Sequence, residues 1–237
     1  MKKFLSVIAI LLLFIGSSIA QVLSPVVTRS KNLDPVKLAQ IDTLLNEYVK
    51  NNWLVGASTI IVKDNQVVYY KGHGFADRAS KKTMDPNSIF RIMSQTKAIT
   101  SLAVLQLFEN GKIGLDQAVG DFIPTFNKQS VLKDFNAADS SYTTVPAKRN
   151  ITIRDLLTHS SGIDYAGIGS EKMKAIYAKA GIPSGLGKIN GTLLEHMKVL
   201  GTLPLVHQPG EKFTYGLNSD LLGCNFVYSQ SYPNNPI

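Results

Sequence analysis

A serine and a lysine stand three residues apart at the start of an apolar stretch, in the run RIMSQTKAITSLAVLQLFENGKIGLDQ from Arg91 to Gln117. If the stretch is helical, Ser94 and Lys97 lie on one face of the helix, one turn apart. A neutral lysine amine there can take the serine proton while the hydroxyl attacks a carbonyl carbon. Burial favours the neutral amine, and the positive helix N-terminus also stabilises a developing oxyanion. The pair therefore predicts a serine nucleophile with its own base.

The S-x-x-K pattern is weak evidence by itself, because the chain contains a second copy. Ser130 and Lys133 have the same spacing but lie in a polar segment with no apolar helix around them. Ser94 also has a simpler interpretation, in which its hydroxyl caps the helix N-terminus and Lys97 is exposed to solvent. The tetrapeptide alone favours this capping role, so the choice depends on the flanking sequence.

Other chemically active side chains give weaker signals. The four histidines have no metal-like spacing to one another, to cysteine or to acidic residues; they are His73, His159, His196 and His207. The single cysteine, Cys224, excludes an internal disulfide, and no activating base stands beside it. We therefore expect neither a metal nor a cofactor.

Hydrophobic periodicity and turn residues predict the elements that position the pair. Two β-branched and aromatic runs, Val55–Val62 and Gln66–Lys71, flank a Lys-Asp-Asn turn and predict a β-hairpin. Residues 125–150 are polar and are expected to be irregular. The helix that begins at Ser94 is apolar on nearly all sides, which is typical of a buried helix. Helices are expected at Pro35–Lys50, Ser94 to about Glu109, residues 115–124, residues 152–163 with a turn at Gly162, Glu171–Ala180 and Thr192–Leu200. This order predicts an α+β fold with antiparallel strands.

Three ordered blocks resemble the serine β-lactamase and penicillin-binding protein superfamily, nearest to class C β-lactamases and the related esterases and D,D-peptidases. The blocks are IFRIMSQTKAITSLAVLQLFENGKIGLDQAVGDFIP, ITIRDLLTHSSGI and HQPGEKFTYGLNSDLLG. The similarity extends from about Leu38 to Gly223. It implies a β-lactamase/transpeptidase-like fold, in which an antiparallel sheet flanked by helices joins a mostly helical lobe.

The resemblance implies roles for the matching residues. Ser94 corresponds to the acylated nucleophile, Lys97 to its base partner, and Tyr215 to the tyrosine that moves the proton to the leaving group. Because the pKa of free tyrosine lies far above neutrality, Lys97 would have to stabilise the phenolate. The alternative for Tyr215 is a buried aromatic residue beside a turn. The sequence around His159 fits a structural hydrogen-bonding residue better than a triad base, and Asp155 fits a charge at a helix N-terminus.

Two departures from the family pattern affect the expected activity. The lactamase form of the tyrosine motif is Tyr-x-Asn, but Leu217 stands in the third position and Asn218 follows it. This weakens the case for β-lactam hydrolysis and strengthens the case for esters. No Lys-Thr-Gly or His-x-Gly strand motif follows, and residues 224–237 form a divergent tail. We expect the C-terminal strands of the fold to be missing and the activity to suffer, because a lost oxyanion donor costs a few kcal/mol.

The first 20 residues resemble a cleavable signal peptide. Lys2 and Lys3 precede an apolar run from Phe4 to Ile15, and small residues precede Gln21. The run is short for a membrane span. Without this leader, which carries two lysines and no acid, the chain has 217 residues and a net charge of +6. That length supports one large domain or two lobes, placed at residues 21–223.

The basic residues are scattered, and no Arg/Lys stripe with interleaved aromatics indicates a nucleic-acid groove. We therefore expect a periplasmic or secreted serine hydrolase that acts through an acyl-serine on an ester, a β-lactam or a D-Ala peptide amide. It is expected to have no nucleic-acid partner and no stable membrane anchor, and the sequence leaves its oligomeric state open. The alternative is a non-catalytic member of the same fold that binds peptidoglycan or a protein.

Overall fold

The computed structural model describes residues 33–184 and 190–231, and it describes side chains as far as residue 224 in the last helix. The predicted signal peptide and the end of the chain lie outside these residues. The chain divides into two compact units, Met1–Arg91 and Ile92–Ile237. Within the described ranges no helix has both the length and the apolar character needed to cross a membrane.

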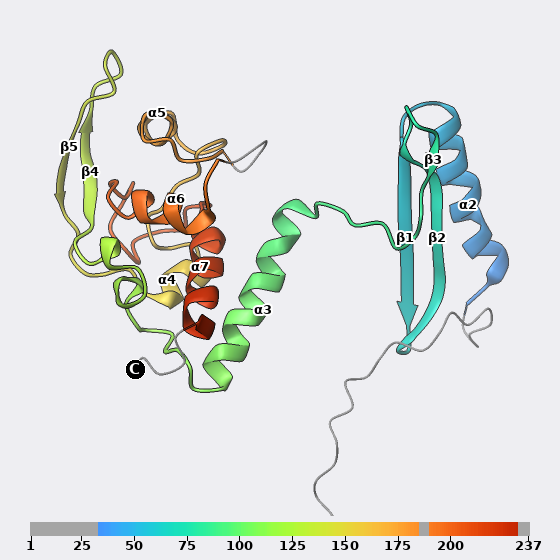
Figure 1. Ribbon diagram of the computed structural model, residues 1–237, viewed down its shortest axis with the longest axis horizontal. Helices are drawn as coiled ribbons and strands as arrows, with labels where there is room; N and C mark the ends of the chain where they lie inside the picture. The colour runs from blue at the N-terminus through green and yellow to red at the C-terminus, as the bar shows by residue number, and fades with distance from the viewer. Residues whose placement is uncertain (1–32, 185–189, 232–237) are drawn as a thin grey trace, which may run out of the picture. The chain divides into compact units, whose positions relative to one another are not determined.

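The first unit is a helix packed on a small antiparallel sheet (Figure 1). The strands β1 (Gly56–Lys63), β2 (Gln66–Asp77) and β3 (Lys82–Thr83) lie in that order and pair antiparallel. Helix α2 (Pro35–Lys50) packs against β2. The predicted hairpin and first helix are therefore confirmed, although β2 continues well beyond the predicted end of its strand.

Local sequence explains the start of helix α2 and the turn between β1 and β2. Asp34 caps α2 by accepting a hydrogen bond from the Val36 N–H, and Pro35 occupies the first turn, where no N–H is needed. Between β1 and β2, Asp64 and Asn65 have φ angles of 49° and 60°. Asp and Asn tolerate this left-handed conformation, which gives the twist that a tight hairpin needs.

The second unit is mostly helical and has its own hydrophobic core (Figure 1). Helices α3 (Thr96–Glu109) and α7 (Asn218–Ser231) pack side by side, and α4 (Ile153–Leu157) and α6 (Leu193–Leu200) also contact α7. Helix α5 (Glu171–Lys179) contributes Met173, Ile176 and Tyr177 to the core. The predicted capped helix, its Gly162 turn with φ 88° and the two later helices are confirmed.

The expectation of irregular structure at residues 125–150 is wrong. Strands β4 (Ser130–Phe135) and β5 (Tyr142–Pro146) form a two-stranded antiparallel ribbon there. Every residue of β5 is exposed, and in β4 only Val131 is fully buried. The alternation of polar and apolar side chains that marks a half-buried strand is therefore faint. The ribbon is held instead by a parallel bridge from Val131 to Leu205, which is far away in the sequence.

The start of the serine-bearing helix also differs from the prediction. A 3₁₀ turn, η1 (Met93–Gln95), contains Ser94, and α3 begins only at Thr96. Gln95 is the N-cap residue and makes no side-chain capping bond, so the capping role considered for Ser94 is wrong. At the other end the predicted stop is confirmed, since Asn110 is the C-cap and Gly111 has a φ of 65°.

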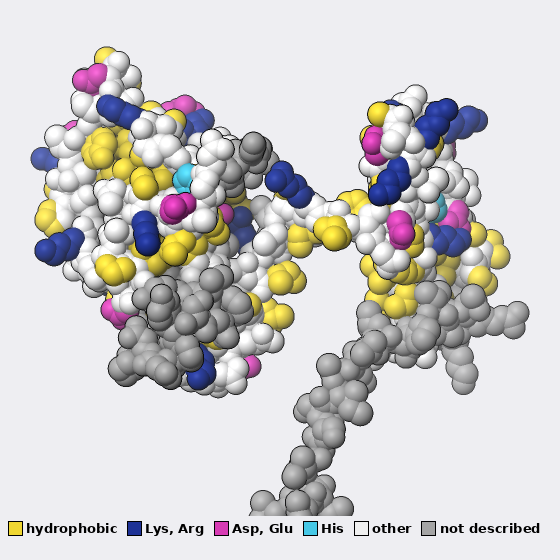
Figure 2. Space-filling view, viewed as in Figure 1, with side chains coloured by type: hydrophobic (Ala, Val, Ile, Leu, Met, Phe, Trp, Pro, Cys, Tyr) yellow, Lys and Arg dark blue, Asp and Glu magenta, His cyan; other side chains and the backbone are white. Residues whose placement is uncertain are grey.

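Helix α3 is described by its packing within the second unit. Within the second unit only Val104 and Leu107 of this helix are buried, because a single face packs against α7. Hydrophobic side chains are visible along α3 in Figure 2. The large apolar residues of this helix that are not part of the core of the second unit are Ile99, Leu102, Leu105 and Phe108. One buried face is thus described within the second unit, and burial of the helix on its other sides stays a prediction.

Two smaller differences concern the short helix predicted at residues 115–124 and the end of helix α7. The short helix predicted at residues 115–124 is replaced by two 3₁₀ turns, η2 (Val119–Asp121) and η3 (Pro124–Phe126). Pro124 begins the second turn instead of ending a helix, which is the place where its missing N–H costs nothing. Helix α7 runs to Ser231, so its backbone continues past Cys224 into the segment expected to be a polar tail.

Candidate active site

Three predicted residues that are distant in the sequence meet in the second unit. Ser94 lies in the η1 turn, Lys97 in the first turn of α3, and Tyr215 in the loop that enters α7. The Tyr215 hydroxyl donates a 2.6 Å hydrogen bond to Ser94 Oγ. Lys97 Nζ lies 4.8 Å from the centroid of the Tyr215 ring. Ser94 is exposed and Lys97 is half-buried, so a substrate can reach the hydroxyl.

This arrangement favours the tyrosine phenolate. The hydrogen bond with Ser94 lowers the pKa of Tyr215, and the positive charge of Lys97 lowers it further, while partial burial opposes both effects. A second aromatic residue, Tyr165, stacks on Tyr215 at 5.8 Å with an interplanar angle of 6°, and Lys97 Nζ lies 5.5 Å from its centroid. Burial raises the pKa of Tyr165, so this phenol stays neutral beside the site.

The loop that carries Tyr215 is held by His159. The imidazole stacks on the Tyr215 ring at 5.2 Å, and its Nδ1 accepts hydrogen bonds from Asn218 Nδ2 at 2.9 Å and from the Gly216 N–H at 3.4 Å. An accepting Nδ1 requires a neutral ring, and burial together with the Lys97 charge lowers the pKa of His159. His159 thus contacts the tyrosine instead of the serine, as expected of a structural residue and not of a triad base.

The residues after Tyr215 point into the protein. Leu217 is almost fully buried, and Asn218 is completely buried with its Oδ1 accepting a 2.5 Å hydrogen bond from Ser161 Oγ. The Asn218 amide is therefore used in fixing the loop to the turn after α4. It is not among the residues that line the cavity at Ser94.

Helix α4, which precedes His159, is fixed by a capping box. Asp155 accepts hydrogen bonds from the N–H and hydroxyl of Thr152, and its carboxylate binds Arg149 through two bonds of 2.5 and 2.9 Å. Burial acts to raise the pKa of Asp155, but these bonds outweigh it and hold the pKa below its ordinary value. This confirms the sequence interpretation of Asp155 as a helix N-terminal charge.

A cavity of about 290 Å³ opens beside the nucleophile. Its lining combines apolar, hydroxyl-bearing and two charged residues; they are Met93, Ser94, Thr96, Lys97, Thr100, Tyr165, Leu193, Ser219, Asp220 and Gly223. Sequence reasoning missed Tyr165 and Asp220. Asp220 stands five residues after Tyr215 on α7, but no local pattern distinguishes it from an ordinary charge in the first turn of a helix.

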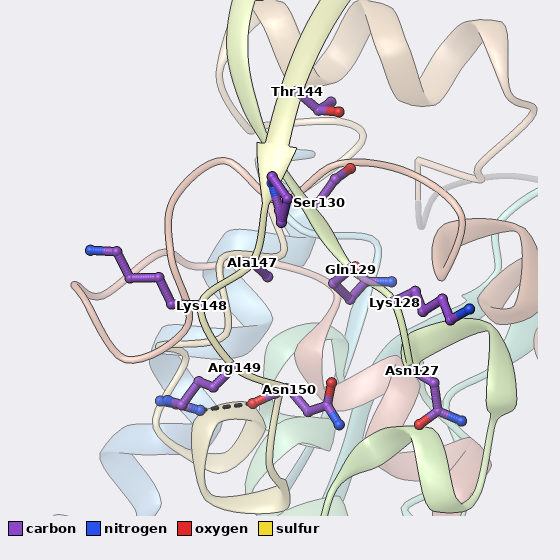
Figure 3. A pocket seen from close by; sticks show the side chains of 10 residues that line it. Asn127, Lys128, Gln129, Ser130, Thr144, Ala147, Lys148, Arg149 and Asn150 are labelled. Carbon is purple, nitrogen blue, oxygen red and sulfur yellow. Dashed lines mark hydrogen bonds between the residues drawn. The ribbon is translucent and has the colours of Figure 1, made fainter.

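The second S-x-x-K copy lies on another surface. Ser130 is on strand β4, and Lys133 is exposed at the irregularity in the pairing of β4 with β5, so they are not one helical turn apart. Ser130 lines a larger hollow of about 660 Å³ at the base of the ribbon (Figure 3). Lys128 and Lys148 also line it, but Figure 3 shows their side chains extending in opposite directions. They therefore do not converge on a common ligand position.

The described residues contain no cluster of three or more metal-binding side chains. Cys224 is a buried free thiol, and burial raises its pKa to about 11. A thiol with such a pKa stays protonated near neutrality and is a poor nucleophile. The chemistry that this geometry can perform is therefore attack by the Ser94 hydroxyl on a carbonyl, assisted by Tyr215 and Lys97.

Comparison with known proteins identifies the family. The protein-family model described as Beta-lactamase matches residues 41–224, which is most of the chain. The chain therefore belongs to the serine β-lactamase-like family, and its fold is of the β-lactamase/transpeptidase type. The resemblance inferred from the three sequence blocks is confirmed.

Individual relatives refine this placement. Esterase EstB of Burkholderia gladioli is 33% identical over 197 residues, which cover 81% of this chain and 46% of that protein. Among solved structures, EstCE1, described as a hydrolase with promiscuous acyltransferase activity, is 27% identical with a TM-score of 0.68, covering 82% of this chain and 47% of that one. The octameric penicillin-binding protein homologue from Pyrococcus abyssi is 28% identical with a TM-score of 0.57, covering 82% and 39%. The chain thus spans less than half the length of these relatives.

Proposed function

We propose that this chain acts as a serine hydrolase on carboxylic esters, through an acyl intermediate on Ser94. The observation that carries the proposal is the 2.6 Å hydrogen bond between Tyr215 and Ser94, with Lys97 beside the tyrosine ring. An acid or base within hydrogen-bond reach of a nucleophile is the geometric requirement for its activation.

The proposed reaction moves one proton back and forth. The Tyr215 phenolate accepts the Ser94 proton, and Oγ forms a bond to the ester carbonyl carbon. Tyr215 then returns the proton to the leaving oxygen as the carbon–oxygen bond breaks and the alcohol departs. Water then attacks the acyl carbon while Tyr215 takes its proton. Tyr215 returns this proton to Ser94 Oγ as the bond between the acyl carbon and Oγ breaks, and the carboxylic acid is released. Lys97 stabilises the phenolate, and the N-terminus of α3 favours negative charge on the developing oxyanion.

Esters are proposed over β-lactams for two reasons. Leu217 occupies the position of the lactamase motif asparagine, and the neighbouring Asn218 is buried against Ser161 and His159 and leaves no amide for the cavity. In addition, EstB is named an esterase and EstCE1 is described as a hydrolase. We therefore expect p-nitrophenyl acetate to be hydrolysed faster than nitrocefin.

Covalent labelling tests the nucleophile. A fluorophosphonate probe should add to Ser94, identified by mass spectrometry of the labelled peptide, and Ser94→Ala should abolish both the label and ester hydrolysis. Ser130→Ala is the matched control, because it removes the serine of the other S-x-x-K copy and should keep both. A folded chain in which Ser94 stays unlabelled, or in which Ser130 carries the label, would contradict the proposal.

A further inference from the structure

The cavity at Ser94 contains one carboxylate whose role the proposed reaction does not explain. Among the described residues that line it, the charged ones are Lys97 and Asp220. Asp220 lies in the first turn of α7, where the helix N-terminus favours a negative charge. The remaining lining residues are neutral, so Asp220 is the one negative charge among the described residues that line the cavity.

Asp220 has no side-chain partner in the described part of the chain. No described side chain donates a hydrogen bond to its carboxylate or forms an ion pair with it, although it is only partly exposed. By contrast, Asp155 of the same unit is bound by Arg149 and Thr152. The carboxylate has a hydrogen bond with its own backbone and the through-space attraction of Lys97, but no side-chain partner replaces the hydration lost on burial, so a ligand cation beside it would be stabilised.

Lys97 does not fill this role. Its Nζ is directed at the rings of Tyr215 and Tyr165, at 4.8 and 5.5 Å from their centroids, and it acts on Asp220 only through space. The opposite charges of Lys97 and Asp220 leave the cavity close to neutral, so a substrate cation is not excluded by the lysine. The face of Tyr165 offers a second favourable surface for such a cation.

We propose that Asp220 is a specificity-determining residue that selects esters carrying a cationic group, such as an ammonium, close to the scissile carbonyl. This inference rests on the proposed ester hydrolysis at Ser94. The carboxylate would bind the substrate cation while Ser94 attacks the carbonyl in the same cavity. Neutral esters would still react, but without this contact.

An isosteric pair of substrates tests the proposal. The p-nitrophenyl ester of γ-(trimethylammonio)butyric acid should be compared with the neutral ester in which a tert-butyl group replaces the trimethylammonium group, together with homologues one methylene shorter and longer. The two esters have the same shape, so the ratio of their kcat/KM values reports charge alone. We expect the cationic ester to be favoured by about tenfold in the best homologue, as for a partly screened ion pair.

Variants test whether Asp220 causes the preference for the cationic ester. Asp220→Asn should reduce the ratio to about one, and Asp220→Glu should preserve most of it. Asp121→Asn removes the same charge from an exposed turn outside the cavity and should leave the ratio unchanged. Dividing by the neutral ester removes any effect of Asp220 on the catalytic groups themselves. An unchanged ratio in Asp220→Asn would overturn the proposal.

The wild-type chain gives an independent readout if Asp220→Asn fails to fold. Burial raises the pKa of Asp220, so the carboxylate is neutralised at a higher pH than an ordinary aspartate and the preference for the cationic ester should fall as the pH is lowered. A pH-independent ratio, or no preference at any pH, would contradict the inference while the hydrolysis of neutral esters still supported the proposed function. Failure to hydrolyse either ester, with Ser94 unlabelled, would instead overturn the proposed function and this inference with it.

Discussion

In the proposed reaction, the position of a single proton between Tyr215 and Ser94 governs whether the serine can attack. In the structure the Tyr215 hydroxyl donates a 2.6 Å hydrogen bond to Ser94 Oγ, as a neutral phenol does. The same contact stabilises the phenolate once the proton is lost, because the serine hydroxyl can then donate to it. Together with the charge of Lys97, this lowers the pKa of Tyr215 and makes the tyrosine a better base near neutral pH.

The pH dependence of hydrolysis should report this shift. Because the phenolate is the reactive form, kcat/KM should rise with pH through the lowered pKa of Tyr215, below the value of about 10 for free tyrosine. Lys97→Met removes the charge that lowers this pKa and should move the rise to higher pH. Tyr215→Phe should reduce kcat by roughly 10²–10⁴-fold.

The control for these profiles is Lys128→Met, which removes an exposed lysine from the hollow beside the ribbon and should leave the pH profile unchanged. If Lys97→Met and wild type had the same pH profile, the proposed link between Lys97 and the tyrosine proton would be wrong. The comparison requires pH–rate measurements with one neutral ester.

At the level of secondary-structure elements, helix α4 and the turn after it determine where His159 and Tyr215 lie. The helix has only five residues, so its own hydrogen bonds stabilise it little. Its capping box and the Arg149–Asp155 ion pair supply the missing stability. Support for the tyrosine thus begins at a buried carboxylate that is not among the residues lining the cavity.

Loss of this carboxylate should destabilise the second unit. Asp155→Asn removes the charge that binds Arg149 and should lower the free energy of unfolding by about 2 kcal/mol; a fully buried pair would cost more, but Arg149 is 45% exposed. Because the folded pKa of Asp155 is lowered, its contribution is present above the unfolded pKa and is lost as pH falls through the folded one. The difference between variant and wild type should therefore shrink in acid.

Denaturant unfolding at neutral and acidic pH measures this difference. Asp116→Asn is the matched control, because Asp116 also binds an arginine, Arg154, but both side chains are largely exposed. Asp116→Asn should lower the free energy of unfolding much less than Asp155→Asn does. Equal losses of unfolding free energy in the two variants would show that the buried position of Asp155 contributes nothing to stability.

The loop between Tyr215 and α7 should tolerate no added side chain at Gly216. A Cβ atom there would lie 2.0 Å from the carbonyl oxygen of Ile163, so the backbone would have to move. Gly216→Ala should shift the adjacent Tyr215 away from Ser94 and lower kcat by about 10²-fold, the typical cost of a displacement near 1 Å. Gly114→Ala, whose Cβ would make only ordinary contacts, should keep wild-type activity in the same ester assay. Unchanged kcat in Gly216→Ala would mean that the loop can adjust.

At the scale of the whole molecule, the three site residues and the cavity all belong to the second unit. The hydrophobic core of that unit, from Val104 to Cys224, is built entirely from its own residues. The first unit contributes a helix, a hairpin and a small set of buried residues, namely Val67, Val68, Tyr69 and His73. The proposed proton transfer can therefore be derived from the second unit alone.

We propose that the chain is exported, because its first 20 residues resemble a cleavable signal peptide. In a bacterial host, N-terminal sequencing of the exported protein should begin at Gln21, because the residues before it have the charge, apolar core and small-residue site of a cleavable signal. Replacing Lys2 and Lys3 by aspartate should hold the uncleaved chain inside the cell. An exported protein that retains Met1 would show that the leader is not removed.

Much of the fold could be predicted from neighbouring residues. The Asp34-Pro35 start of α2, the Asp64-Asn65 turn and the Thr152–Asp155 capping box each depend on contacts within a few positions, so the local sequence is sufficient. The β4–β5 ribbon could not be predicted, since its stability comes from pairing with residue 205 and not from its own pattern.

The candidate site could likewise be predicted only in part from the sequence. The spacing of Ser94 and Lys97 indicated the nucleophile, but family resemblance was needed to select Tyr215, which lies 121 positions away from the serine. The sequence by itself therefore determined the hairpin, most of the helices and the family, and it indicated Ser94 and Lys97 as the candidate reactive pair. Only the tertiary structure brought the Tyr215 hydroxyl to Ser94, stacked Tyr165 beside it and turned Asp220 toward the same cavity, because such contacts depend on how α3 packs against α7.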